Sequence, residues 1–411
     1  MPTDRFQHHA QHQLAALEQE GRRKGREHVV QAVLPATASR GPRVVVDGRE
    51  YLRMNSNGYL GLSQHPDLIR AEHEAARRYG VGPGAVRFIS GTLEPHVRLE
   101  ERLAAFHGRE AAMLFSSAYA TVISTLTALI DADTAVISDE LNHNCIVNAL
   151  RLARPRSKRV YTHLDLGDLA AALDEVSDAR RVVVVTDGIF SMRGAHAPLA
   201  EITRLVAGHD ARFPHNALVV LDDSHGVGAF GPTGRGTEEF TGARADLLIG
   251  TLGKAFGVNG GYVVGPRVLL DYLREVAPMY VFSNPITPPE ACAALAALDL
   301  LEGEEGRERL AHLRAMTERF RQGLRDLGLE TLDGAHPVVP LFLRDTARTR
   351  AVVTHLEGHG ILATGLTYPV VPRGDDSVRF QVNADHTPDD LDGVLEALRL
   401  FTLRPQPEAR A

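Results

Sequence analysis

The feature that most restricts the fold of this chain is a regular alternation, between about residues 55 and 300, of short apolar runs with amphipathic helical patterns. The apolar runs are almost continuous Val, Ile and Leu, which is typical of strands buried on both faces. Such strands, separated by helices, predict a mainly parallel α/β sheet. The strand candidates are residues 112–117, 135–139, 181–187, 217–223, 246–251 and 262–265, with helical patterns such as 166–176 and 199–210 between them.

Different patterns flank this region, so we expect three segments. Residues 1–54 form an arm with a helical pattern over 12–30, followed by a hairpin whose turn is Asp47-Gly48. Residues 55–300 form the large domain. Residues 301–411 begin with a long helical pattern and then contain three apolar runs, which predicts a smaller C-terminal α+β domain; these runs are 336–343, 361–369 and 377–384.

The composition argues against several classes of protein. A net charge of −7 gives no reason to expect a nucleic acid or an anionic membrane as a partner. The best apolar stretch, residues 120–130, is about half as long as a membrane span. Cys145 and Cys292 are far apart and lack metal-ligand spacing, so we expect no disulfide, no metal site and a reducing cytoplasm. No secretory signal is recognisable at the N-terminus.

One lysine stands out in a chain that otherwise uses arginine. Among 45 basic residues only Lys24, Lys158 and Lys254 are lysines, and Lys254 lies in the stretch TLGKAFGVNGG directly after a predicted strand. Unlike arginine, a desolvated lysine can lose its proton and attack a carbonyl group. Lys254 is therefore a candidate nucleophile, although position alone equally allows an ordinary lysine.

Polar residues follow two other strands at the edge of the sheet where ligands bind. Ser116 and Ser117 lead from a strand into a helical pattern, which suits a phosphate site but equally a plain helix cap. Asp222 and Asp223 end an apolar strand, where a carboxylate needs a partner. Either could hold a cationic ring nitrogen, with His225 beside it, and the alternative is again a helix cap with a satisfied histidine.

Two nucleotide-binding motifs are only formally present. The pattern of Gly226, Gly228 and Gly231 matches G-x-G-x-x-G but continues into a turn-rich loop rather than a helix. The stretch around Lys254 is not a Walker A loop, because Leu248 replaces the first glycine and Ala255 follows the lysine. A candidate Schiff-base lysine, a carboxylate and a phosphate loop are instead what pyridoxal 5′-phosphate (PLP) requires.

At these residues the chain resembles the α-oxoamine synthases, a family of PLP-dependent enzymes that includes glycine C-acetyltransferase (2-amino-3-ketobutyrate CoA ligase), 8-amino-7-oxononanoate synthase, 5-aminolevulinate synthase and serine palmitoyltransferase. The resemblance covers nearly all of the chain from about residue 50. It implies the PLP-dependent transferase fold type I (aspartate aminotransferase-like), with a seven-stranded sheet in the large domain. The matching stretches include VRFISGTLEPHVRLEERLAAFHG, TDGIFSMRG, VVLDDSHGVGAFGPTGRG, TLGKAFGVNGG, YVFSNPITPP and YPVVPRGDDSVRFQVNADHT.

The resemblance also implies roles for individual residues. Lys254 matches the Schiff-base lysine, Asp222 the partner of the pyridine nitrogen, and His143 the imidazole stacked on the cofactor ring. His225, with Ser191 beside it, matches the histidine that bonds the ring hydroxyl. The remaining implied contacts are Ser117, Ala118, Tyr119 and Thr251 for the phosphate, Ser283 and Asn284 for the phosphate of the neighbouring subunit in a homodimer, Arg379 for the substrate carboxylate, and Asn57 near the substrate.

The implied reaction joins a small amino acid, glycine first, to an acyl-CoA thioester and gives a 2-amino-3-oxo acid or, after loss of CO2, an aminoketone. Three departures from the family pattern lie on the substrate side: Arg193 stands where Asp is usual, Gly58 where Asn or Asp is usual, and Ala85 where Ser is frequent. An 8-amino-7-oxononanoate synthase-like reaction or a carrier-protein thioester therefore stays open. So does another fold type I reaction, such as an aldolase, aminotransferase or decarboxylase. A non-catalytic scaffold would not need Lys254 and Asp222.

Overall fold

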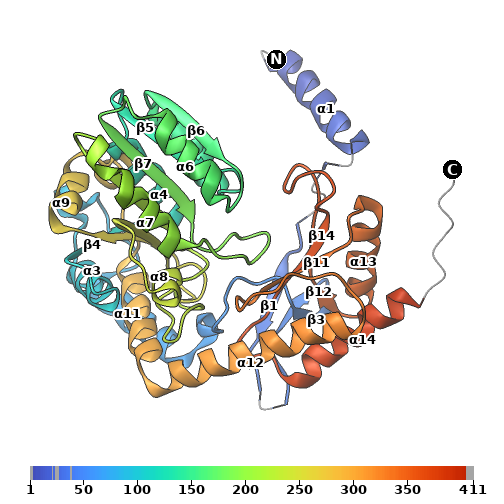
Figure 1. Ribbon diagram of the computed structural model, residues 1–411. Helices are drawn as coiled ribbons and strands as arrows, with labels where there is room; N and C mark the ends of the chain where they lie inside the picture. Colours follow the sequence, from blue (N-terminus) through green and yellow to red (C-terminus); the bar gives the residue numbers. More distant parts are fainter. Residues whose placement is uncertain (1–2, 21, 24–26, 38, 404–411) are drawn as a thin grey trace.

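The computed structural model describes residues 3–20, 22–23, 27–37 and 39–403, and its largest unit is a seven-stranded sheet (Figure 1). The strand order is β4-β10-β9-β8-β7-β5-β6, and β10 alone runs antiparallel to its neighbours. The mainly parallel seven-stranded sheet predicted from the sequence is thus confirmed. The strands are β4 (Ala111–Phe115), β5 (Thr134–Asp139), β6 (Ser157–Tyr161), β7 (Arg181–Asp187), β8 (Ala217–Asp222), β9 (Leu247–Thr251) and β10 (Gly261–Gly265).

Both faces of this sheet are buried, which explains the unbroken apolar runs. Along β7, Val182 and Val184 belong to one hydrophobic cluster, whereas Val183 and Val185 belong to another. Alternate side chains of a strand point to opposite faces, so the two clusters are the two layers between sheet and helices. The helices of this large lobe are α2 (Pro66–Tyr79), α3 (Glu94–Phe106), α4 (Ala118–Leu129), α5 (Asn144–Ala153), α6 (Leu166–Glu175), α7 (Leu199–His209), α8 (Thr237–Thr241), α9 (Arg267–Val276), α10 (Pro278–Val281) and α11 (Pro288–Glu302).

A small lobe contains two further sheets. Strands β11 (Val338–Phe342), β14 (Ser377–Gln381) and β13 (Thr364–Leu366) form an antiparallel sheet. A four-stranded sheet joins β1 (Val30–Leu34), β2 (Arg43–Val46) and β3 (Arg49–Arg53) from the beginning of the chain to β12 (Ile361–Leu362). The helices are α12 (Glu304–Asp326), α13 (Thr346–Gly358) and α14 (Pro388–Thr402), and α12 runs from the large lobe to the small one (Figure 1).

The predicted hairpin at Asp47-Gly48 is confirmed. β2 and β3 pair antiparallel, and both turn residues have positive φ, 48° for Asp47 and 73° for Gly48. A two-residue turn of this kind needs such backbone angles at both positions, which Asp-Gly tolerates. The division of the chain at residues 54 and 300 stays a prediction.

Two elements differ from expectation. Strand β6 was not predicted, because it is an edge strand with the sequence SKRVY and mostly exposed side chains, so it lacks the apolar run of its neighbours. The helix of the arm is α1 (Asp4–Gln19), whereas the pattern placed it over residues 12–30. Val29 and Val30, which extended that pattern, instead lead into and begin β1. Lys24 lies outside the described residues.

Candidate active site

Most of the predicted PLP residues line one cavity at the carboxyl ends of the sheet strands. Each residue of this lining set lies at the end of a strand that runs in the common direction or in the segment after it, and the loop after β9 carries Lys254. Parallel strands place these ends at one edge of the sheet. The cavity is lined by Ala118, Tyr119, His143, Cys145, Asp187, Ile189, Ser191, Asp222, Ser224, His225 and Lys254.

The N-terminus of α4 forms one wall and is suited to an anion. Ser117 caps this helix, and its side-chain oxygen accepts a hydrogen bond from the Ala120 amide at 3.1 Å. The amides of Ala118 and Tyr119, in the first turn, have no acceptor within the helix. A Cβ atom on Gly261 would lie 2.3 Å from the Ala118 nitrogen, so only glycine allows β10 to pass this closely. Thr251, at the end of β9, is buried and donates to the Gly260 carbonyl at 3.2 Å.

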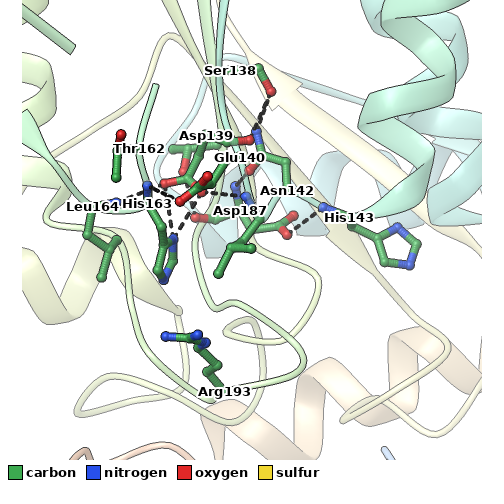
Figure 2. Close-up of polar contacts among 12 residues, drawn as sticks. Ser138, Asp139, Glu140, Asn142, His143, Thr162, His163, Leu164, Asp187 and Arg193 are labelled. Carbon is green, nitrogen blue, oxygen red and sulfur yellow. Dashed lines mark hydrogen bonds and ion pairs between the residues drawn. The ribbon is translucent and has the colours of Figure 1, made fainter. Parts of the chain in front are cut away.

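His143 is held by its backbone amide (Figure 2) and by Nδ1 of its ring. Its amide donates to Asp187 Oδ2 at 2.9 Å, and its Nδ1 accepts from the Cys145 amide at 3.2 Å, which caps α5. In Figure 2 the ring points away from Asp187. Burial lowers the pKa of His143, so the ring is neutral at neutral pH. A neutral, fixed imidazole is suited to stacking on a flat ring.

The loop that carries His143 is braced from two sides (Figure 2). Asn142 donates to the Val185 carbonyl and accepts from the Asp187 amide, both at 2.8 Å, which ties the loop to β7. Asp139 accepts from His163 Nδ1 at 3.0 Å, and Glu140 accepts from the His163 amide at 2.9 Å. These contacts fix the loop after β5 to the loop after β6.

The two adjacent aspartates at the end of β8 face different surroundings. Asp222 lines the cavity, with its Oδ1 accepting from the Ser224 amide at 3.1 Å and its Oδ2 lying 3.7 Å from Cys145 Sγ. Asp223 instead accepts from the backbone amide and the hydroxyl of Thr237, at 2.6 and 2.7 Å. Burial raises the pKa of Asp223 to about 7. The geometry thus separates a cavity carboxylate from an internal one, which residue order alone left open.

Lys254 is largely buried, and this burial lowers the pKa of its amine although the charge of Asp222 opposes the shift. Asp187 lines the same cavity, and burial, followed by repulsion from Asp222, raises its pKa well above the usual value. A neutral amine can act as nucleophile or base, whereas an ammonium cannot. The cavity therefore holds Lys254 in an environment that favours its reactive form.

His225 lines the same cavity and is supported by the side chains of Tyr59 and His336. The Tyr59 hydroxyl lies 2.6 Å from His225 Nδ1, and His336 donates from Nε2 to the His225 carbonyl at 2.8 Å. Burial lowers the pKa of His225 well below its usual value, and that of His336 to about 3. Both imidazoles are therefore neutral at neutral pH.

The two predicted substrate residues lie beside the cavity, on the small-lobe side. Arg379 of β14 is largely buried and donates to the Ser191 carbonyl at 3.0 Å, while its Nε has no partner among the described residues. Asn57 accepts from Gln381 at 2.6 Å. A buried guanidinium with an unused donor is suited to a carboxylate.

Ser283 and Asn284 are the predicted site residues that lie away from the cavity. They follow α10, and Ser283 lines a separate surface hollow with Met279 and Phe282. Large apolar side chains are exposed on this loop and on the segment 87–91: Phe282 is 81 % exposed, and Phe88 and Ile89 are each 68 % exposed. Exposed apolar side chains of this size mark an interaction surface where they gather in one patch.

A second pocket of about 320 Å³ lies between the lobes. The loops after β5 and β7 line both this pocket and the cavity, because Asn142 and Met192 face the pocket while His143 and Ser191 face the cavity. Its walls are largely apolar, with Phe190, Phe342 and Val370 among them. Arg193 projects from the large-lobe loop and pairs with Asp375 of the small lobe.

Sequence reasoning missed four residues around the cavity: Tyr59, Cys145, Asp187 and Asn142. A strand-end signal, a carboxylate terminating an apolar run, was available for Asp187. Tyr59 and Cys145 carried no such signal, because their partners are 166 and 77 residues away along the chain. Among the described residues, no group of three or more His, Cys, Asp or Glu could hold a metal ion, and no helix is long and apolar enough to cross a membrane.

Comparisons with known proteins identify the family of this chain. Residues 49–398 match the family described as aminotransferase class I and II. The 8-amino-7-oxononanoate synthase of Exiguobacterium sibiricum is 42 % identical over 359 residues, which is 87 % of this chain and 90 % of that protein. The mitochondrial 2-amino-3-ketobutyrate coenzyme A ligase of Homo sapiens is 40 % identical over 366 residues, 88 % of this chain and 85 % of that protein.

The solved structure of the Sphingomonas wittichii serine palmitoyltransferase superposes with a TM-score of 0.87 at 27 % identity, over 98 % of this chain and 99 % of that one. These relatives are named as different α-oxoamine synthases, so their names do not identify the substrates of this chain. The predicted resemblance and the fold type I architecture are confirmed. The chain belongs to the class I and II aminotransferase family and, within it, to the PLP-dependent α-oxoamine synthases.

Proposed function

We propose that this protein is a C-acyltransferase that uses PLP to condense a small amino acid, glycine first, with an acyl-CoA thioester. The product is a 2-amino-3-oxo acid or, after decarboxylation, an aminoketone. The observation that carries the proposal is the burial of Lys254 in one cavity with Asp222, His143 and His225. Relatives named for two such condensations, at 42 % and 40 % identity, support it.

The cavity residues fit PLP group by group. The first-turn amides of α4 suit the phosphate, with Thr251 close to β10. Asp222 presents a carboxylate with a free lone-pair side for the ring nitrogen, and His143 offers a flat neutral ring. When bound, PLP supplies an electron sink that makes the α-proton of an amino acid removable. Lys254 is the attachment point.

The chain's own residues have separable tasks in this scheme. The Lys254 amine, whose pKa burial lowers, accepts the α-proton. Asp222 keeps a proton on the ring nitrogen by its negative charge. Arg379, with an unused Nε, binds the amino-acid carboxylate by a charge-assisted hydrogen bond. His225 donates a hydrogen bond to an oxygen within the cavity, where charge develops.

The apolar pocket between the lobes is our candidate for the acyl donor, because it shares two loops with the cavity. An 8-amino-7-oxononanoate synthase-like reaction, with alanine and a longer acyl thioester, is the alternative favoured by the relatives with that name. We further propose a homodimer, in which Ser283 and Asn284 reach the partner's phosphate site, and a cytoplasmic location. The exposed Phe282 and Phe88 support the dimer.

A thiol-release assay tests the proposal directly. Glycine, alanine and serine are each combined with acyl-CoAs from acetyl to long-chain, and free CoA is measured. We expect release that depends on one amino acid and on PLP, and its absence in Lys254→Ala. Borohydride should fix PLP to the peptide that contains Lys254 and not to the one that contains Lys158. Transamination or retro-aldol cleavage without thiol release would instead favour another fold type I reaction.

A further inference from the structure

Tyr59 makes a buried hydrogen bond that the proposed chemistry has not used. It lies in the segment between β3 and α2, its side chain is fully buried, and its hydroxyl is 2.6 Å from Nδ1 of His225. His225 lines the cavity that contains Lys254. The two residues are 166 positions apart, so this contact exists only in the folded chain.

The direction of this hydrogen bond follows from the other partners of the two groups. Among the described residues, the Tyr59 hydroxyl has one hydrogen-bond partner, His225. If Nδ1 carried the hydrogen, the phenolic O–H would be buried without an acceptor, which is unfavourable. Burial also raises the pKa of Tyr59, so the phenol keeps its proton. Tyr59 therefore donates, and Nδ1 accepts.

A neutral imidazole carries a single N–H, so an acceptor at Nδ1 places the hydrogen on Nε2. In the described part of the chain, no group accepts a hydrogen bond from Nε2 of His225. We propose that Tyr59 is a positioning residue that holds His225 in the Nε2–H tautomer, so that His225 donates a hydrogen bond into the cavity. This inference rests on the proposed function, because the acceptor it implies is an oxygen of bound PLP or substrate.

The small lobe holds this pair in place. The Ala384 amide donates to the Tyr59 carbonyl at 2.7 Å. The His336 ring packs edge-on against Tyr59 at 5.3 Å, donates from Nε2 to the His225 carbonyl at 2.8 Å, and accepts at Nδ1 from the Val338 amide at 3.1 Å. His336 thus has one consistent tautomer, and the position of its ring fixes both partners. Rotation of the His225 ring would break the contact with Tyr59.

The tautomer of His225 should affect the absorption spectrum of bound PLP. An Nε2–H donor stabilises the ionised ring oxygen of PLP, the form in which the bound cofactor is yellow. An unprotonated Nε2 would instead accept a hydrogen bond and favour the protonated oxygen, which absorbs in the near ultraviolet. The ratio of the visible to the near-ultraviolet band at fixed pH therefore reports on the hydrogen that Tyr59 controls, independently of turnover.

The test compares Tyr59→Phe with Tyr262→Phe. Tyr262 is a matched control, because its hydroxyl also bonds a buried histidine, His107 Nε2 at 2.9 Å, but outside the cavity. For Tyr59→Phe we expect the band ratio and kcat to fall roughly fivefold, the factor that the net contribution of one hydrogen bond corresponds to, with little change in the amino-acid KM. Tyr262→Phe should leave ratio and kcat unchanged even if it lowers the unfolding temperature.

A double-mutant cycle shows whether Tyr59 changes the band ratio and kcat through His225. If Tyr59 acts through His225, Tyr59→Phe should change nothing further in a His225→Ala background. An equal loss in both backgrounds, or a Tyr59→Phe enzyme with the wild-type band ratio and kcat, would overturn the positioning role. A wild-type protein that is colourless with PLP and carries no reducible PLP on Lys254 would instead overturn the proposed function, and this outcome is read from the same samples.

Discussion

Neighbouring residues of the same type have different tasks at the end of β8. Asp222 faces the cavity and Lys254, whereas Asp223 turns inward and accepts two hydrogen bonds from Thr237. The Asp223 side chain is also closely surrounded by backbone. A Cβ atom would lie 2.1 Å from Asp223 Oδ1 if added to Gly226 and 2.2 Å from it if added to Gly188. The internal carboxylate therefore organises the glycine-rich loop, whereas the cavity carboxylate is the one that we propose for the cofactor.

Alanine substitution should separate these tasks. We expect Asp222→Ala to keep its fold and to lose about a hundredfold or more in kcat, because a preorganised charge in the site is removed. Asp223→Ala should cost about 1–3 kcal/mol in the free energy of unfolding, because the Thr237 donors become unsatisfied. Denaturant unfolding and steady-state kinetics on both variants check this. A mild Asp222→Ala and an inactive, stable Asp223→Ala would show that the wrong carboxylate was chosen.

Some residues of the candidate site could be predicted from the sequence around them, whereas others depend on contacts with distant parts of the chain. The positions of Lys254, Asp222 and Ser117 at the edge of the sheet could be predicted, because each lies at or shortly after the end of an apolar strand and the chemistry restricts which residue types can stand there. Tyr59, Cys145 and Asn142 could not, since their meaning depends on partners from distant segments. The sequence pattern likewise could not show that the Asp222 side chain faces the cavity and the Asp223 side chain the interior, because this difference depends on their tertiary contacts.

At the scale of elements, the burial of a strand determines whether its sequence pattern predicts it. The central strands of the large sheet are buried on both faces and were predicted nearly to the residue, whereas the exposed edge strand β6 was missed. A large apolar side chain is exposed next to the short helix α10: Phe282 directly follows this helix and is 81 % exposed. In the homodimer that we propose, a second copy of the chain covers this side chain.

We therefore expect Phe282→Asp to weaken self-association at least tenfold, because a charge would be buried in an apolar contact. Sedimentation velocity over a range of concentrations measures this. Val268→Asp is the control: Val268 is 78 % exposed but lies near the start of α9, whose first amide contacts Glu110 at the amino end of β4, away from the cavity. The dimer surface is misplaced if both variants associate like the wild type.

At the scale of the whole molecule, the candidate cavity is lined by the large lobe, and the small lobe contacts it where Arg379 donates to the Ser191 carbonyl. The small lobe contributes Arg379, the partners of Asn57 and Tyr59, and Asp375, which pairs with Arg193 of the large lobe. Asp375 also accepts from Arg344 of its own lobe at 2.7 Å. The sequence identified Arg193 as a departure from the family pattern, but its partner lies 182 residues further along the chain and could not be inferred.

Arg193→Asp, which introduces the residue usual in the family, should test what this contact does. It would place two carboxylates face to face at the rim of the interlobe pocket, and we expect the lobes to separate there. The loss should be about 1 kcal/mol in the free energy of unfolding, since the pair is partly exposed. We also expect faster hydrogen exchange in residues 368–376 and a raised KM for the acyl donor with little change for the amino acid.

Arg344→Gln is the matched control, because it removes the other cation from Asp375 without crossing between the lobes. If it disturbs the acyl-donor KM as much as Arg193→Asp does, the charge on Asp375 matters and the interlobe contact does not. If Arg193→Asp selectively raises the amino-acid KM instead, Arg193 lies on the path of the amino-acid carboxylate. Arg379 would then lose the task assigned to it here, because a single carboxylate needs only one such anchor.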